Sequence, residues 1–224
     1  MFRASVISLA LFGSASAFAP SARSATGTSL KVANGWAPDE SEFAYGLPGA
    51  LAPVGNFDPL GFTEGKSLDD VKRLREAEVT HGRVAMLAAL GFLVGENFHP
   101  LFGLDGKEIL GIDSLTEVRV VFPAFFELLA VLIAGAELNR AIYGWISPTD
   151  RGATGVEGNT LRDDYYPGDI GFDPLGLKPT DASEYALIQT KELQNGRLAM
   201  LAVAGMVAQE LVDGKPILLN DFGI

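Results

Sequence analysis

The chain carries nearly the same helix-like stretch twice, and this internal repeat constrains its fold more than any other feature. "EAEVTHGRVAMLAALG" begins at Glu76 and "TKELQNGRLAMLAVAG" begins at Thr190, so that the Gly-Arg pair recurs after 114 residues. A Phe-Asp-Pro-Leu-Gly segment precedes each copy, at Phe57 and again at Phe172. Repeats decide how a chain is divided, and we interpret the two halves as one duplicated unit within a single domain.

Composition narrows the class of protein. Of the 224 residues 48% are hydrophobic, and the mean hydropathy of +0.22 favours a membrane protein with polar loops. The net charge of −11 argues against a nucleic-acid partner, because phosphate backbones are bound by basic surfaces. The chain has no cysteine, which excludes disulfides and thiolate metal sites, and its two histidines leave little for a histidine-rich metal enzyme.

The first 32 residues have the composition of a targeting leader. Residues 1–17 combine Arg3, an apolar run and a small-residue end, as in a signal peptide. Residues 18–32 are rich in Ser, Ala and Thr without acids, as in a transit peptide. The "AFAP" junction resembles bipartite leaders of plastids surrounded by extra membranes, with plain secretion as the alternative. We expect the mature domain over residues 33–224.

Three segments have the apolar character of membrane-spanning helices. Val120–Trp145 is long enough to cross a bilayer, which takes about 20 residues. Val84–Val94 and Leu198–Ala208 are shorter, and each reaches that length only if its helix begins earlier, before the repeated glutamate. The sequence predicts an all-α membrane protein with three transmembrane helices, the first and third related by a pseudo-twofold axis. Basic residues before the first span and between the second and third place the N-terminus on the basic side.

Each repeat puts a glutamate and an arginine at membrane depth, where an unpaired charge is costly. Glu78 and Arg83 are five positions apart, roughly 140° around a helix, and therefore cannot face each other. Glu192 and Arg197 have the same spacing. The duplication favours reciprocal pairs between the crossing helices, Glu78 with Arg197 and Glu192 with Arg83.

Glycines beside these charges predict where the two helices approach. Gly82 and Gly196 each precede one of the arginines and permit close contact between backbones. Gly91 and Gly95 have the G-x-x-x-G spacing that predicts a second close approach further along.

Further polar side chains follow the same helices. Glu78 and His81 are three residues apart, as are Glu192 and Asn195, so that each pair presents two Lewis bases on one side. Gln209 lies about four turns beyond Asn195. Such donors suit axial ligation of a metal that another chelator already holds, such as the magnesium of chlorophyll. A role as mere staples between helices is the alternative.

These motifs are similar to those of the chlorophyll-binding light-harvesting complex superfamily, from about residue 33 to the C-terminus. The resemblance implies a thylakoid protein without enzymatic activity, whose N-terminus faces the stroma. It implies these axial ligands of chlorophyll magnesium: Glu78, His81, Glu137, Glu192, Asn195 and Gln209. Arg83, Arg140 and Arg197 would pair with the ligating glutamates. Asp58 and Asp173, in the Phe-Asp-Pro-Leu-Gly segments, would lie near the end rings of two carotenoids, with turn chemistry before proline as the alternative.

Two positions depart from the simple pattern. In the middle helix Glu137 and Arg140 can pair at a spacing of three, but Leu129 stands where many relatives have a second polar ligand. Glu127 lies two residues from that place and is a substitute or a helix-end residue. His99 follows the first span, and we expect a further ligand there, with an interfacial cap as the alternative.

Resemblance to the red-lineage branch implies chlorophyll a with chlorophyll c and a fucoxanthin-like carotenoid. The implied partners are a photosystem core, with photosystem I favoured, neighbouring antenna proteins and thylakoid lipids. A light-harvesting antenna is the leading interpretation. A photoprotective relative that quenches excitation is the alternative, and a transporter with a polar path through the buried charges is a third.

Overall fold

The computed structural model describes residues 34–96, 110–150 and 160–217, so that the expected leader and His99 lie outside the described residues. The elements in chain order are η1 (Phe43–Gly46), α1 (Leu68–Gly95), η3 (Gly111–Asp113), α2 (Ser114–Val121), α3 (Phe125–Gly144) and α5 (Ala182–Asp213). Isolated β-bridges join Leu51 to Gly55 and Trp145 to Leu161, and the described ranges contain no strand. The fold is therefore helical, as expected.

Capping side chains begin both long helices. Ser67 precedes α1, and its hydroxyl accepts a hydrogen bond from the amide of Asp70 at 3.3 Å. Asp181 precedes α5, and its carboxylate accepts hydrogen bonds from the amides of Ser183 and Glu184. Such caps satisfy amides that the first helical turn leaves without partners. Both helices therefore begin well before their apolar parts and include the repeated glutamates.

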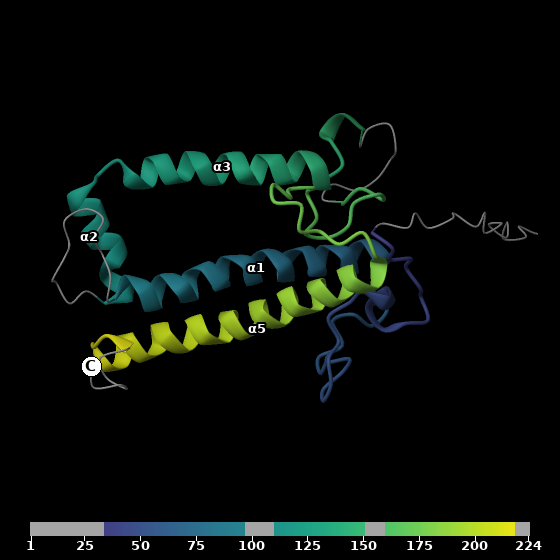
Figure 1. The fold of residues 1–224 in the computed structure, drawn as a ribbon, viewed down its shortest axis with the longest axis horizontal. Helices are drawn as coiled ribbons and strands as arrows, with labels where there is room; N and C mark the ends of the chain where they lie inside the picture. The colour runs from purple at the N-terminus through teal and green to yellow at the C-terminus, as the bar shows by residue number, and fades with distance from the viewer. Residues whose placement is uncertain (1–33, 97–109, 151–159, 218–224) are drawn as a thin grey trace, which may run out of the picture.

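The two repeats form α1 and α5, which lie side by side and run in the same direction (Figure 1). Buried positions recur at a spacing of three on both helices, at Val79, Gly82 and Ala85 on α1 and at Leu193, Gly196 and Ala199 on α5. A Cβ on Gly82 would lie 3.1 Å from the Cα of Gly196. The helices thus cross with their backbones close together at these two glycines, as predicted.

The prediction of a second close approach at Gly91 and Gly95 is wrong. A Cβ built at these positions would meet no described atom within 4 Å beyond the local backbone. Gly95 lies about 20 Å along the helix from Gly82. Helices that cross at an angle separate over such a distance, so this G-x-x-x-G spacing marks no close contact among the described residues.

The middle apolar segment is broken near its start. The sequence predicts one helix over Val120–Trp145, whereas α2 ends at Val121 and α3 begins at Phe125, with a bend of 111°. Pro123 lies in the break, and proline has no amide hydrogen to donate and disfavours helical backbone in the preceding residue. Phe122 accordingly adopts φ −132° and ψ 85°. The predicted start of this helix is therefore wrong.

Length and apolarity single out α1 among the described helices as able to cross a membrane by itself. Only 11% of the apolar 18-residue stretch within α1 is buried, whereas the core helix of a soluble protein is mostly buried. The bent pair formed by Gly111–Val121 and α3 is long and apolar enough to cross a membrane if the two are taken as one span, whereas α5 is not. The count of three spans therefore goes beyond what length and composition establish.

The largest buried cluster of apolar side chains is small and includes Val71 in the first turn of α1. Leu47, Val71 and Tyr166 form a buried cluster, against which Trp36 and Tyr45 pack. The rings of Trp36 and Tyr166 meet edge to face at 5.7 Å. Most large apolar side chains of the helices are exposed, and this leaves long apolar faces for something other than this chain to cover.

Candidate functional site

Two reciprocal ion pairs join α1 and α5 at their crossing. Nε of Arg83 lies 2.7 Å from Oε1 of Glu192, and Nε of Arg197 lies 2.8 Å from Oε1 of Glu78. The pairing predicted from the duplication is therefore confirmed. All four side chains keep between 28% and 43% of their surface exposed. The pairs thus compensate each carboxylate without hiding it from the faces of the bundle.

The two glutamates have different surroundings. Oε2 of Glu78 lies 3.2 Å from Nε of Arg75, so that both of its carboxylate oxygens face arginines. The position equivalent to Arg75 in the second repeat is Gln189, whose Oε1 accepts a hydrogen bond from the hydroxyl of Tyr166 at 2.9 Å. Glu192 therefore keeps an oxygen, Oε2, outside its arginine pair. The repeats are alike in backbone but different in charge.

His81 and Asn195 each have one polar atom bound to their own helix. Nδ1 of His81 lies 2.7 Å from the carbonyl oxygen of Ala77. Because a carbonyl can only accept, Nδ1 carries the proton and the lone pair of Nε2 remains available. Nδ2 of Asn195 donates to the carbonyl of Lys191 at 2.9 Å. Its Oδ1 is then the atom that can act as a metal ligand, and both side chains are exposed.

The middle helix contributes a third carboxylate. Nη2 of Arg140 lies 2.8 Å from Oε2 of Glu137, which confirms the pair predicted within this helix. The side chain of Glu137 remains 57% exposed. Nη1 of Arg140 lies 3.5 Å from Oε1 of Glu76 on α1. Arg140 therefore bridges two glutamates and connects α3 to α1.

Glu76 is a functional candidate that the sequence analysis missed. Its side chain is 4% exposed and its Oε2 accepts hydrogen bonds from the hydroxyl of Tyr165 at 3.0 Å and the amide of Gly168 at 2.6 Å. Burial and the negative charge of Glu76 raise the pKa of Tyr165, which keeps its hydroxyl protonated as a donor. The sequence does contain a signal for Glu76, because it is a second glutamate two positions before Glu78. At that spacing the two side chains lie on different faces of the helix.

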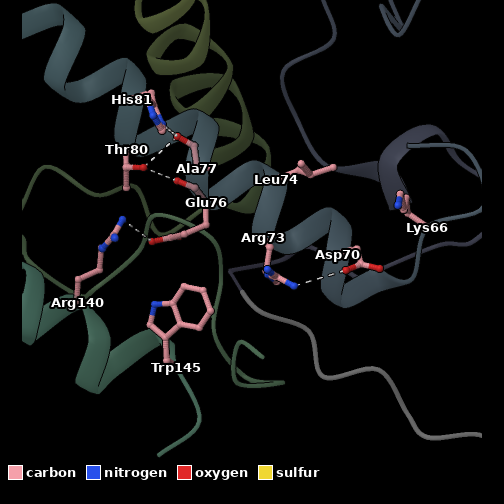
Figure 2. A pocket seen from close by; sticks show the side chains of 10 residues that line it. All are labelled: Lys66, Asp70, Arg73, Leu74, Glu76, Ala77, Thr80, His81, Arg140 and Trp145. Atoms are coloured by element: carbon pink, nitrogen blue, oxygen red, sulfur yellow. Dashed lines mark hydrogen bonds and ion pairs between the residues drawn. The ribbon is translucent and has the colours of Figure 1, made fainter. Parts of the chain in front are cut away.

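Two cavities open beside this bridge, the first between α1 and α3 and the second bounded by α5 as well. One, of about 470 Å³, is lined by residues that include Arg73, Leu74, His81, Arg140 and Trp145. Figure 2 shows Arg140 and Trp145 facing Glu76 of α1 across this space. The other cavity, of about 500 Å³, shares His81 and Arg140 and is lined by Glu137 as well. The structure thus brings His81 and Glu137, predicted separately as ligands, to one hollow.

Gln209 is not brought to this place. It lies half-buried on α5, about 20 Å along the helix from Asn195. Glu127 is exposed in the first turn of α3 and occupies a helix-end position. His99 lies outside the described residues. The predicted ligands are therefore distributed along the helices rather than gathered in one centre.

The two predicted loop residues are turn formers. Asp58 accepts hydrogen bonds from the hydroxyl of Thr63 and from the amides of Thr63 and Phe62, at 2.6 to 2.9 Å. Asp173 accepts the amides of Leu177 and Lys178. These donors lower the pKa of both carboxyls. Both carboxylates thus stabilise turns, and both segments project apolar side chains, at Phe57, Leu60 and Phe62 and at Phe172, Leu175 and Leu177.

The donors suit a metal that brings its own chelator. The described residues contain no group of three or more His, Cys, Asp or Glu that could hold a bare ion. A magnesium ion enclosed by a macrocycle needs a single axial donor, and oxygen or imidazole atoms on separate helical turns supply that. The exposed apolar faces fit the same large, flat and mostly apolar ligand.

Comparison with known proteins agrees with this chemistry. Residues 43–211 match the family described as Chlorophyll A-B binding protein. The chain is 50% identical over 183 residues to light-harvesting complex stress-related protein 1 of Chlamydomonas reinhardtii, covering 80% of this chain and 70% of that protein. It is 52% identical over 174 residues to the fucoxanthin-chlorophyll a-c binding protein of Isochrysis galbana, covering 77% and 80%. A chlorophyll a-b binding protein of Petunia hybrida is 33% identical over 182 residues, covering 79% and 65%.

Proposed function

Because this chain belongs to the chlorophyll A-B binding protein family, we propose that it is a light-harvesting antenna that binds chlorophylls and carotenoids and passes excitation energy to a photosystem. Members of this family bind pigments and are not enzymes, so the chain serves as a scaffold without a catalytic step. Its relatives are named as chloroplastic proteins, which supports a location in the plastid thylakoid membrane.

The observation that carries the proposal is the pair of side chains beside the crossing. His81 and Asn195 each commit one atom to their own helix and leave one ligating atom outward. Chlorophyll, when bound, would supply the light absorption, and the protein would supply a ligand to its magnesium and the spacing between pigments. The chain would provide these axial ligands: Glu78, His81, Glu137, Glu192, Asn195 and Gln209. Arg83, Arg140 and Arg197 would cancel the charge of the ligating carboxylates.

Three membrane spans are part of the proposal. α1, α3 and α5 would cross the bilayer, with α1 and α5 related by a pseudo-twofold axis and with the N-terminus in the stroma. Support comes from the reciprocal ion pairs, because α5 carries its charges where α1 can neutralise them. The apolar sides of all three helices would be covered by pigments and thylakoid lipids.

The proposed pigment types draw on the names of relatives. The similarity to a fucoxanthin-chlorophyll a-c binding protein supports chlorophyll a, chlorophyll c and a fucoxanthin-like carotenoid. The loops around Asp58 and Asp173 would hold the end rings of two carotenoids, since each loop exposes three large apolar side chains. We propose a photosystem core, with photosystem I favoured, and neighbouring antenna proteins as partners.

A photoprotective function is the second candidate. It is favoured by the 50% identity to a protein named as stress-related, which is close to the 52% identity to the fucoxanthin-binding relative. Such a protein would bind similar pigments but dissipate the excitation. The two functions differ in the fate of absorbed energy rather than in the residues that hold the pigments.

Fluorescence of the purified native protein tests both candidates. For an antenna, the excitation spectrum of chlorophyll a emission should follow the absorption spectrum through the carotenoid bands, with a long emission lifetime. For a quencher, the absorption should be the same and the lifetime strongly shortened. Absence of carotenoid bands from the excitation spectrum of a long-lived emitter would refute the antenna, and absence of bound pigment would refute both.

A further inference from the structure

The bridge between α1 and α3 depends on Glu76. Along α3, which the structure describes completely, Gly144 is the one buried residue. At the C-terminal end of α3 the helix contacts the loop that follows it, since the amide of Arg162 donates to the carbonyl of Gly144 at 2.9 Å. Glu76 holds the chain segment that follows α3 through Tyr165 and Gly168, and it also reaches Arg140 within α3. One buried carboxylate therefore contacts both the helix and its anchoring loop.

Lys72 complements this contact one turn earlier on α1. Its side chain is buried, and Nζ donates to the carbonyl of Arg162 at 2.8 Å. Lys72 thus binds acceptors of the loop while Glu76 binds its donors. Together with Arg140, these side chains connect α1 both to α3 and to the loop that follows it.

The guanidinium of Arg140 is oriented by the two glutamates. Nη1 faces Glu76 and Nη2 faces Oε2 of Glu137. Among the described residues, its Nε is buried without a hydrogen-bond partner, so no further acceptor fixes the group. Because Arg140 is shared, it contacts one oxygen of Glu137, and Oε1 of that carboxylate has no place in the pair.

We propose that Glu76 is a positioning residue that holds Arg140 between two carboxylates and so keeps one oxygen of Glu137 available as a chlorophyll ligand. Without the charge on Glu76, Arg140 can turn both Nη atoms toward Glu137 and form the bidentate pair that guanidinium and carboxylate favour. That pair occupies both oxygens that could ligate magnesium. The inference rests on the proposed function and assigns a role to a residue outside the ligand set.

The experiment uses the full mature chain assembled with a chlorophyll and carotenoid extract from the native membrane. Glu76→Gln keeps an acceptor for Tyr165 and Gly168 but removes the charge that holds Arg140. Partners of a metal ligand typically contribute about 10–100-fold to metal affinity, so the pigment at Glu137 should be lost. Chlorophyll per protein is measured by pigment extraction, and the affected pigment is identified by circular dichroism. Glu184→Gln, the same change at an exposed carboxylate of α5, is the control.

Comparison with Glu137→Leu separates positioning from simple support. Glu76→Gln should remove the same circular dichroism band as Glu137→Leu, and the double variant should lose no more pigment than the single ones. A merely structural role would lower all pigments together, and that result would overturn the inference, as would full pigment content in Glu76→Gln. If Glu137→Leu itself keeps every chlorophyll, the ligand set of the proposed function fails instead.

A second variant decides the matter if Glu76→Gln yields no pigmented protein. Tyr165→Phe keeps the charge on Glu76 and removes one hydrogen bond that fixes its carboxylate. Partial loss of the Glu137 band in this variant, with the other bands intact, supports positioning. An unchanged spectrum in Tyr165→Phe, together with failed assembly of Glu76→Gln, would overturn it in favour of a role in folding alone.

Discussion

Gly82 and Gly196 meet at the crossing of α1 and α5, where a Cβ on Gly196 would lie 2.9 Å from the Cα of Gly82. The nearest atoms on both sides belong to backbone, which cannot rotate away as a side chain can. The ion pairs of Arg83 and Arg197 flank this contact. The separation of the two helices is therefore set by the absence of side chains at these two positions.

Gly196→Ala should push the helices apart and weaken both ion pairs. Overpacking of a tight contact typically costs about 1–3 kcal/mol. We expect a lower thermal midpoint of pigment release, followed by circular dichroism in the chlorophyll bands. Gly205→Ala on the same helix is the control, because a Cβ there would meet no described atom within 4 Å. Equal midpoints for the two variants would contradict the close crossing.

Arg83→Leu should prevent stable assembly with pigments. It leaves the carboxylate of Glu192 without its arginine, and an unpaired carboxylate within a proposed membrane span costs on the order of 3 kcal/mol. Refolding yield and pigment content measure the effect. Arg73→Leu removes an exposed arginine of the same helix, whose pair with Asp70 spans 3.7 Å, and should assemble normally. A full pigment complement in Arg83→Leu would show that the pair is dispensable.

Single-ligand variants should lose pigments one at a time. His81→Leu and Gln209→Leu each delete a neutral axial donor and strand no charge, so the bundle should survive. Pigment extraction should give about one chlorophyll fewer per protein in each variant, since one axial donor serves one magnesium. The two losses should add in the double variant, because the sites lie far apart on different helices. Unchanged stoichiometry in both variants would remove the basis of the ligand assignment.

Residues 34–46 should be held less tightly in acid. Asp169 accepts hydrogen bonds from Lys178, Asn34 and the amide of Gly171. Burial alone would raise the pKa of this carboxyl, but these donors together hold it below its ordinary value. A depressed pKa stabilises the folded state above the unfolded pKa of about 3.9, and the stabilisation is lost as pH falls through the folded pKa.

Amide hydrogen exchange of residues 34–46 between pH 6 and pH 2 measures how tightly they are held. After correction for the intrinsic pH dependence of exchange, protection in the wild-type chain should be full above the ordinary carboxyl pKa of about 3.9 and should fall as the pH drops through the lower pKa of folded Asp169. Asp169→Asn should show low protection at every pH. A pH-independent wild type would show that another contact holds the segment.

Helix bounds show how far sequence patterns reach. The sequence contains a proline, Pro123, where the helix breaks, yet the apolar run around it favoured a continuous helix. Hydrophobicity is insensitive to a missing amide hydrogen, and the 111° bend follows from backbone chemistry. Likewise the spacing of Gly91 and Gly95 on α1 indicated a contact with α5, but the two helices separate beyond their crossing, and a Cβ at either glycine would meet no described atom of α5 within 4 Å.

The sequence by itself determined the reciprocal pairing at the crossing. Duplication means that each half carries a charge the other half can neutralise, and five-residue spacing on a helix excludes the local pair. Only the tertiary structure decided what Glu76 does. Its partners Arg140, Tyr165 and Gly168 lie between 64 and 92 positions away, and no period in the chain links them. A contact made by a loop that folds back onto a helix leaves no repeat to read, because it depends on where the loop ends rather than on helical spacing.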